Sequence, residues 1–267
     1  METSQQFLAI NKASWNHRTV AHLNTPFYNL PGFMQGENML KSIELNLLGD
    51  ISGLKVLHLQ CHFGLDTLSL ARMGAQVTGV DLSDVAIQQA QTIAAESGIN
   101  ASFICCDVYD LPNHLNEKFD LVFTSYGTIT WLPDLDKWAH IIQHFLKTEG
   151  RFVFAEFHPV VWMFDDNFSK LQYDYFNTAP IVETEAGTYA DQAADLSLQY
   201  VTWNHPISEV LQALIKNGLA LQQFQEFDYS PYPCFKNLIE KSPGKFVVEH
   251  VKTAMPMVYA IEAQKHS

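Results

Sequence analysis

The sequence predicts an α/β fold, a doubly wound and mostly parallel sheet of seven strands. Between residues 55 and 157, five short apolar runs alternate with segments of helical periodicity. The runs are apolar at nearly every position, which is typical of parallel strands that helices bury on both faces. Right-handed crossovers then place helices on both sides of the sheet. Ligands on such sheets bind beyond the carboxyl ends of the strands, so the residues just after each strand are the candidate site.

The elements of this region follow one another in a regular order. The expected strands are residues 55–59, 75–81, 102–107, 119–127 and 151–157. The helical spacing of apolar residues predicts helices over 65–73, 84–97 and 135–146. Gly74, Gly98 and Gly150 are expected to end these helices, because glycine readily adopts the left-handed conformation found at helix C-termini.

The alternation stops at residue 158. Residues 158–205 are rich in aromatic residues and irregular, and we expect them to form a cap inserted after the fifth strand. A helix over 206–217 and two further strands, 219–229 and 256–265, bring the sheet to seven strands. No internal repeat or linker composition divides the chain, so a single domain over residues 1–267 explains the layout best.

Composition excludes several classes of protein. The net charge of −13, from 29 acidic residues against 16 Lys and Arg, repels phosphate backbones and anionic membrane surfaces, and no local basic patch offsets it. No apolar run reaches the length of about 18 residues that a membrane helix needs, and the first residues lack a signal-peptide pattern. The four cysteines form no C-x-x-C pair. We therefore expect a cytoplasmic protein that binds neither nucleic acid nor membranes, with a homodimer among the expected assemblies.

Two carboxylates stand at the ends of consecutive strands. Asp81 ends the second strand, at the position where a carboxylate can accept hydrogen bonds from both hydroxyls of a ribose. Asp107 ends the third strand, where it could meet an adenine amino group. The helix 65–73 begins right after Gly64, so its free N–H groups point at whatever the preceding loop holds. The alternative for Asp81 is an ordinary charge at a helix N-terminus.

The motifs around these acids resemble a known family. Residues 56–90, "VLHLQCHFGLDTLSLARMGAQVTGVDLSDVAIQQA", are similar to the first two motifs of class I S-adenosylmethionine-dependent methyltransferases. The stretches "ICCDVYDLP" and "FDLVFTSYGTITWLPDLDKWAHIIQHFLKTEGRFVFAEFHP" resemble the later motifs, in order. The resemblance covers about residues 50–160 and is weaker at the last two strands. It implies a Rossmann-like methyltransferase fold with a substrate cap after the fifth strand.

The same resemblance implies the cofactor, S-adenosylmethionine, and its product, S-adenosylhomocysteine. Asp81 would bind the ribose, Asp107 and Val108 the adenine, and the loop 58–64 the methionine part. The residues expected to contact the cofactor are His58, Gln60, Cys61, His62, Gly64, Asp81, Leu82, Asp107, Val108, Ser125 and Tyr126. The helical segment 1–49 would close over this site, as such segments do in relatives of this fold.

The loop 58–64 departs from the family's pattern. The family usually has an acid where His58 stands and glycines where Gln60 and His62 stand, so that only Gly64 remains of three glycines. A β-carbon at position 60 or 62 requires a negative φ, or strain if φ is positive. His58 and His62 also suggest metal ligands, but no acid or cysteine set completes such a site, and we expect no metal.

Two histidines and several aromatic residues are candidates for catalysis and substrate binding. His158 follows the fifth strand and His205 precedes the helix 206–217, and either could act as a general base because the pKa of histidine lies near working pH. A turn histidine before proline is the alternative for each. The aromatic residues that could form an apolar wall for an organic substrate are Trp15, Tyr28, Trp162, Tyr173 and Trp203.

The expected function is transfer of a methyl group from S-adenosylmethionine to an unidentified small-molecule acceptor. The cofactor supplies the reactivity, so the protein positions the reactants and excludes water, and no catalytic triad is needed. The altered loop keeps open a protein that binds the adenosyl cofactor without catalysis. An NAD-dependent oxidoreductase is disfavoured, because Gln60, His62 and Leu65 occupy the positions of the G-x-G-x-x-G fingerprint and no Tyr-x-x-x-Lys pair exists.

Overall fold

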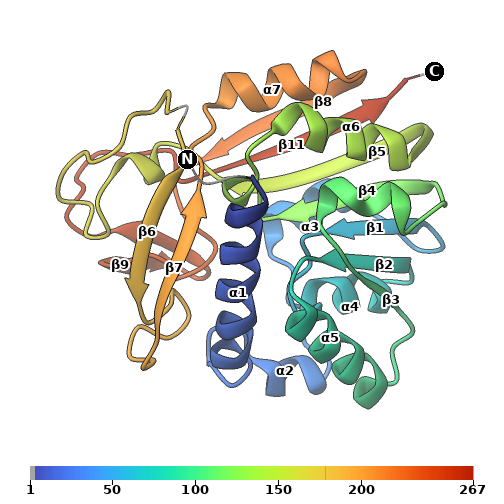
Figure 1. Cartoon of the computed structure of the whole chain (residues 1–267), viewed down its shortest axis with the longest axis horizontal. Coiled ribbons are helices and arrows are strands. Elements are labelled where there is room, and N and C mark those ends of the chain that lie inside the picture. Colours follow the sequence, from blue (N-terminus) through green and yellow to red (C-terminus); the bar gives the residue numbers. More distant parts are fainter. Residues whose placement is uncertain (1–3, 178, 267) are drawn as a thin grey trace.

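A computed structural model of the chain describes residues 4–177 and 179–266. Its main sheet has seven strands in the order β3-β2-β1-β4-β5-β11-β8 (Figure 1). The strands are β1 Lys55–Leu59, β2 Gln76–Asp81, β3 Ser102–Cys105, β4 Phe119–Ser125, β5 Leu146–Phe157, β8 Leu219–Phe227 and β11 Val258–Lys265. The first five pair in parallel, and β11 runs antiparallel to both β5 and β8. The predicted seven-stranded, mostly parallel sheet is therefore confirmed.

Helices cover both faces of this sheet, as the crossovers require. The main helices are α3 Ser42–Leu48, α4 Leu65–Arg72, α5 Asp84–Ser97, α6 Leu135–Phe145 and α7 Ile207–Lys216. Alternate strand residues point to opposite faces. Leu57 and Val122 join a buried cluster with α6 and α7, whereas Val56 and Phe123 join a second cluster with α3 and Leu70. The fold is thus doubly wound, with one core on each side of the sheet.

The boundary between α6 and β5 differs from the expectation. The helix ends at Phe145, and β5 begins at Leu146, so Gly150 lies inside a strand and does not end the helix. A β-carbon at Gly150 would lie 2.9 Å from the Lys147 carbonyl oxygen and 3.2 Å from that of Phe119. The register between β4 and β5 shifts between Phe119 and Leu121. Glycine is therefore needed here for a close backbone approach at an irregular strand.

The region 158–205 is more ordered than its sequence suggested. After the short 3₁₀ helix η3 Val161–Met163, it contains an antiparallel pair, β6 Ile181–Ala186 and β7 Ser197–Thr202, which lies beside the main sheet (Figure 1). The long loop between β8 and β11 also holds a hairpin, β9 Leu238–Ser242 and β10 Lys245–Val248. Neither hairpin was predicted, because their sequences lack a clear alternation of apolar and polar residues.

The N-terminal segment consists of α1 Ser4–His22, α2 Leu30–Met34 and α3. Helix α1 lies between the β6–β7 hairpin and the sheet (Figure 1). Asn11 joins α1 to the hairpin, because its side chain exchanges two hydrogen bonds of 2.8 Å with the backbone of Val201. On the other side, Lys12 forms an ion pair of 2.9 Å with Asp84 of α5. Helix α1 therefore contacts both the β6–β7 hairpin and helix α5, which packs on the main sheet.

Candidate functional site

A cavity of about 980 Å³ opens at the carboxyl ends of β1, β2 and β4. The loops after these strands form one wall, while α1 and the β6–β7 hairpin form the opposite wall. All eleven predicted cofactor residues line it: His58, Gln60, Cys61, His62, Gly64, Asp81, Leu82, Asp107, Val108, Ser125 and Tyr126. The structure thus brings these side chains together in one place, at the edge of the sheet that the topology favours for ligands.

The loop after β1 has an unusual backbone. Gln60 has a φ of 55° and His62 a φ of 51°, both in the left-handed region. Non-glycine residues at such angles cost about 1–2 kcal/mol each. The loop is held in this shape by hydrogen bonds from Cys61 N to the Val80 carbonyl at 2.9 Å and from Gln60 Nε2 to the Thr128 carbonyl at 2.8 Å. The backbone conformation that suits glycine is therefore present without the glycines.

Asp81 joins this loop to the start of α5. Its two carboxylate oxygens accept hydrogen bonds from His62 N at 2.7 Å and Ser83 N at 2.8 Å. Burial nevertheless raises its pKa to about 6. Asp107 lies after β3 and accepts a bond of 3.1 Å from Tyr109 N, which caps the 3₁₀ helix η1 Val108–Asn113. Both carboxyl groups therefore have fixed positions on the cavity wall.

The start of α4 completes the same wall. Gly64 has a φ of 79°, and a β-carbon there would lie 2.8 Å from the Phe103 ring and 3.0 Å from Ala90 Cβ. Asp66 in the first turn of α4 also lines the cavity, with its carboxylate 3.5 Å from Ser125 Oγ, and burial raises its pKa to about 6. Asp66 is not among the site residues predicted from the sequence. Its place two residues after Gly64, at a helix N-terminus, was the available signal.

Glu156, near the end of β5, anchors the loop after β4. The Glu156 carboxylate accepts hydrogen bonds from the backbone N–H groups of Gly127, of Thr128 at 2.7 Å and of Ile129 at 3.2 Å. Tyr126, in the same loop, donates a bond of 2.7 Å to Glu44. Burial raises the pKa of Glu44 to about 7. Glu156 thus shapes the loop that presents Ser125 and Tyr126 to the cavity.

Aromatic rings join the N-terminal segment to the loop after β1. His62 stacks on His22 at 5.4 Å and on Tyr28 at 5.4 Å between ring centroids, and Trp15 meets it edge-on at 5.1 Å. Burial lowers the pKa of His22 to about 3 and that of His62 well below its ordinary value. Both rings are therefore neutral in the folded protein at neutral pH, and this contact is a stack of uncharged rings.

The predicted substrate residues also lie on the cavity wall. Trp15 and Tyr28 come from the N-terminal segment, whereas Trp162, Tyr173 and Trp203 come from the region after β5. His58 lines the cavity as well, but its ring is buried and bonded to Thr67 Oγ1 at 2.8 Å, and burial lowers its pKa to about 3. The cavity thus has a polar end at the sheet and an aromatic end under α1 and the hairpin.

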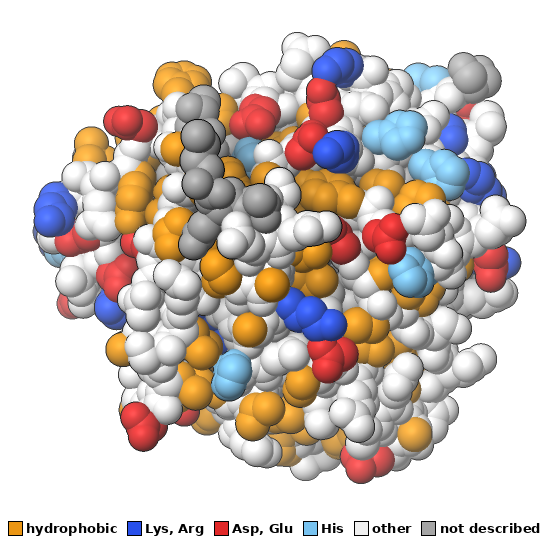
Figure 2. All heavy atoms as spheres, in the orientation of Figure 1, with side chains coloured by type: hydrophobic (Ala, Val, Ile, Leu, Met, Phe, Trp, Pro, Cys, Tyr) orange, Lys and Arg blue, Asp and Glu red, His pale blue; other side chains and the backbone are white. Residues whose placement is uncertain are grey.

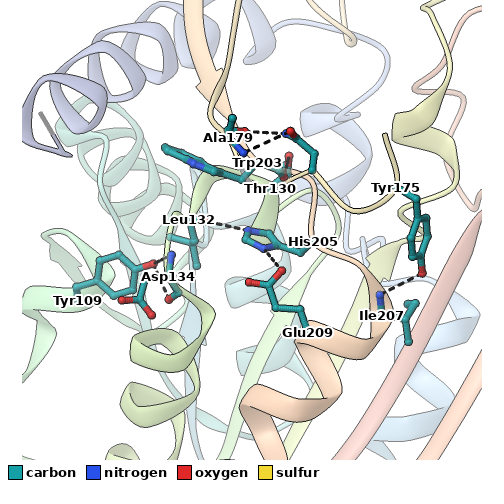
Figure 3. Close-up of polar contacts among 11 residues, drawn as sticks. Tyr109, Thr130, Leu132, Asp134, Tyr175, Ala179, Trp203, His205, Ile207 and Glu209 are labelled. Atoms are coloured by element: carbon teal, nitrogen blue, oxygen red, sulfur yellow. Dashed lines mark hydrogen bonds and ion pairs between the residues drawn. The ribbon is translucent and has the colours of Figure 1, made fainter. Parts of the chain in front are cut away.

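His158 and His205 are not among the residues that line this cavity. His158 Nε2 lies 2.9 Å from Glu226 Oε1, and its Nδ1 accepts a bond of 3.2 Å from Val160 N. His205 Nε2 lies 2.8 Å from the Leu132 carbonyl, and its Nδ1 lies 3.0 Å from Glu209 (Figure 3). Both ring nitrogens of each histidine are engaged in fixing a turn. This placement removes the geometric basis for assigning either histidine as a base.

The face of the molecule in Figure 2 carries scattered charges. Its Lys and Arg side chains stand apart from one another and do not gather into a patch. Among the residues that the structure describes, no helix has the length and apolar character needed to cross a bilayer.

Comparison with known proteins agrees with this architecture. A model of the methyltransferase domain family matches residues 50–213. A ubiquinone biosynthesis O-methyltransferase of Alkalilimnicola ehrlichii is 31% identical over 108 residues, which cover 40% of this chain and 43% of that protein. The chain spans about half the length of the curated relatives it matches. The family match excludes α1, so the residues that α1 contributes are outside the shared region.

Solved structures share the fold over most of the chain. An S-adenosylmethionine-dependent methyltransferase from Mesorhizobium loti has a TM-score of 0.58 and 19% identity, and the match covers 87% of this chain and all of that one. A geranyl diphosphate C-methyltransferase from Streptomyces coelicolor A3(2), solved with S-adenosyl-L-homocysteine, has a TM-score of 0.61 and 15% identity, with 98% of each chain covered. At these identities the likeness shows the fold alone.

The family match and the sheet topology together define the class. The chain belongs to the class I S-adenosylmethionine-dependent methyltransferases. The family's cofactor is S-adenosylmethionine.

Proposed function

We propose that this protein transfers the methyl group of S-adenosylmethionine to a small-molecule acceptor held at the aromatic end of the cavity. The observation that carries the proposal is the shape of the cavity itself, about 980 Å³ with strand-end carboxylates at one end and aromatic rings at the other. This volume suits a cofactor and a second small molecule together. The left-handed backbone at residues 60 and 62 supports the fit, because it keeps the loop bent as in a glycine-rich loop.

Each part of the polar end has a role in this proposal. Asp81 would accept hydrogen bonds from the ribose hydroxyls, and Asp107 with Val108 would meet the adenine. The loop 58–64 and the N-terminus of α4 would hold the methionine part, with Asp66 available to its ammonium group. The bound cofactor supplies an electrophilic methyl group on a sulfonium. The chain's own residues then have to orient the acceptor in line with that methyl group and keep water out.

The aromatic end would perform this second task. Trp15, Tyr28 and Trp203 are large, rigid side chains that can hold an organic molecule at low entropic cost. Because this wall comes from α1 and the β6–β7 hairpin, acceptor choice would reside in elements outside the sheet. The net charge of −13 supports a metabolite and not a nucleic acid as the acceptor. We also propose a cytoplasmic location and a homodimer, the latter to be tested by sedimentation.

Ligand-dependent thermal stability tests cofactor binding. S-Adenosylhomocysteine should raise the melting temperature of the purified chain, and NAD should not. Asp81→Ala should abolish this shift, because it removes the proposed ribose contacts. The matched control is Asp50→Ala, which removes an exposed carboxylate that accepts a bond from Ser52 N at 2.9 Å. An unchanged shift in Asp81→Ala would remove Asp81 from the ribose role.

Turnover distinguishes an enzyme from a protein that only binds the cofactor. S-Adenosylmethionine labelled in its methyl group should transfer the label to one member of a metabolite panel and leave S-adenosylhomocysteine. Binding of the cofactor without transfer to any member would favour a binding protein. The His158→Ala variant is expected to transfer the label at the same rate as the unchanged protein, since His158 does not line the cavity.

A further inference from the structure

Strand β6 turns its charged side chains inward. Ile181, Glu183 and Glu185 are half-buried and line the cavity, while Val182 and Thr184 between them are exposed; Thr184 also reaches the cavity rim, whereas Val182, 46% exposed, does not line it. A strand that packs for stability alone places its apolar residues inside and its charges outside. The opposite arrangement here indicates that the inner face of β6 meets something polar.

The two glutamates differ in how their charges are balanced. Glu185 forms an ion pair of 2.7 Å with Arg18 Nη2. The guanidinium of Arg18 also lies within 5.3–5.9 Å of the ring centroids of three aromatic residues. The charge of Glu185 is therefore neutralised within the wall of the cavity. Arg18 is buried, and its Nε also donates a bond of 3.3 Å to Ser14 Oγ.

Glu183 has hydrogen-bond donors but no cation. Its carboxylate accepts a bond of 2.9 Å from the Tyr200 hydroxyl and another from the Tyr173 hydroxyl. Among residues 4–177 and 179–266, no Lys, Arg or His lies within ion-pair distance of it. The two phenols fix the carboxylate in place without neutralising its charge, so among the described residues this carboxylate has hydrogen-bond donors but no cation within ion-pair distance.

A row of aromatic rings connects this carboxylate to the cofactor end. The centroid distances are 5.1 Å from His62 to Trp15, 5.1 Å from Trp15 to Trp131 and 5.8 Å from Trp131 to Tyr200. All four of these side chains line the cavity. Aromatic faces attract organic cations, and they do so more strongly where water is excluded. The wall between the cofactor loop and Glu183 is thus aromatic, and the guanidinium of Arg18 already lies within 5.3–5.9 Å of the ring centroids of Trp15, Trp131 and Tyr200. A ligand cation would therefore meet the carboxylate of Glu183 itself, next to Tyr173 and Tyr200.

We propose that Glu183, held by Tyr173 and Tyr200 beside Trp131, is the recognition subsite for a substituted ammonium group on the methyl acceptor. This rests on the proposed function and names the chemical class of its acceptor, an organic cation or protonated amine. Glu183 acts by binding the cation and is not a base. An acceptor carrying a phosphate or carboxylate group would instead meet Glu183 with a like charge.

Binding of two probes of equal shape tests the subsite. The full chain, saturated with S-adenosylhomocysteine, is titrated calorimetrically with choline, a compact quaternary ammonium ion, and with 3,3-dimethyl-1-butanol, in which carbon replaces the nitrogen. Choline should bind at least tenfold more tightly than the alcohol. Glu183→Gln should weaken choline at least tenfold and leave the alcohol unchanged. Glu249→Gln, an exposed glutamate outside the cavity, controls for the same change in net charge.

Each alternative result has a defined meaning. Equal binding of the two probes to the unchanged protein, or no binding of either, overturns the subsite without any variant. Retention of choline affinity by Glu183→Gln also overturns it, provided that this variant binds S-adenosylhomocysteine normally and is therefore folded. Failure of the unchanged protein to bind S-adenosylhomocysteine would instead count against the proposed function itself.

Discussion

The two ends of the cavity are built in different ways. At the sheet end, buried carboxylates fix the loops: Asp81 and Glu156 each accept hydrogen bonds from main-chain N–H groups of neighbouring loops. At the other end, side chains of α1 and β6–β7 make the site, through ion pairs and ring contacts such as Arg18 with Glu185. The family match, residues 50–213, includes the first end and the β6–β7 hairpin of the second end, and it excludes α1. Under the proposed function, the cofactor would bind at the end whose loops are fixed by backbone hydrogen bonds, and the choice of acceptor would depend on the side chains of the other end.

The largest expected effect comes from the anchor of the loop after β4. Glu156→Gln replaces a buried carboxylate that accepts several backbone N–H groups with an amide that can accept fewer and brings its own donors. We expect a loss of about 3–5 kcal/mol in the free energy of unfolding, together with loss of S-adenosylhomocysteine binding. Chemical denaturation measures the first and calorimetry the second. Glu149→Gln, an exposed change on the same strand, should stay within about 0.5 kcal/mol of the original stability.

The second effect separates backbone strain from steric overlap at the sheet end. Gly64→Ala adds a β-carbon 2.8 Å from the Phe103 ring at a φ of 79°, and we expect a loss of about 3 kcal/mol. Gly98→Ala has a similar φ of 66° with no neighbour within 4 Å, and about 1 kcal/mol is expected there. Equal losses in the two variants would show that the contact with Phe103 contributes nothing.

The third effect concerns the stack that joins the two ends. Burial lowers the pKa of His22 from 6.5 to about 3. Between these two pH values His22 is protonated in the unfolded chain but neutral in the folded chain, so the free energy of unfolding decreases as pH falls from 6.5 towards 3. His22→Phe keeps a ring on His62 but removes this titration. Relative to the original protein, the variant should gain about 2 kcal/mol of stability between pH 7 and pH 5.

Three buried carboxyl groups have raised pKa values and change the stability with pH in the opposite direction: Glu44, Asp66 and Asp81. The measurement is therefore the difference in free energy of unfolding between the variant and the original protein at each pH. Tyr28→Phe is the control, since it alters the same cluster without a group that titrates in this range. A difference between His22→Phe and the original that does not change with pH would contradict the assignment of a neutral buried His22.

The smallest effect is expected on the outer side of the β6–β7 hairpin. Val182→Thr changes an exposed residue next to Glu183, and it should alter the free energy of unfolding by less than about 0.5 kcal/mol. Choline and S-adenosylhomocysteine affinities should both stay within twofold. A strong effect on either affinity would show that the two sides of this strand are not functionally distinct.

The sheet, and the gathering of the named strand-end residues on one cavity wall, were predictable from the sequence because both depend on local patterns. Apolar runs such as that of β1 and acids at strand ends such as Asp81 are visible without knowledge of the rest of the chain. Strand β6 was missed because its inner face carries Glu183 and Glu185, which is the reverse of the pattern that indicates a strand. The start of β5 was missed because Leu146 continues the helical spacing of α6, and only tertiary pairing with Phe119 makes it extended.

The role of the histidines depended on contacts between distant segments. His205 is bonded to the Leu132 carbonyl, which is 73 positions away in the sequence, and His158 to Glu226, which is 68 positions away. Neither pairing leaves a signal in the local sequence. The residue type allows a base at both positions; in the structure neither histidine lines the cavity, and a catalytic role for either stays a prediction.

The loop after β1 has a consequence for how such proteins are recognised. Gln60 and His62 depart from the family's glycine pattern in residue type, yet their φ values of 55° and 51° lie in the region that glycine adopts most readily. A search pattern that demands glycine at positions 60 and 62 would reject this chain, although its backbone there has the left-handed conformation for which glycine is usually required.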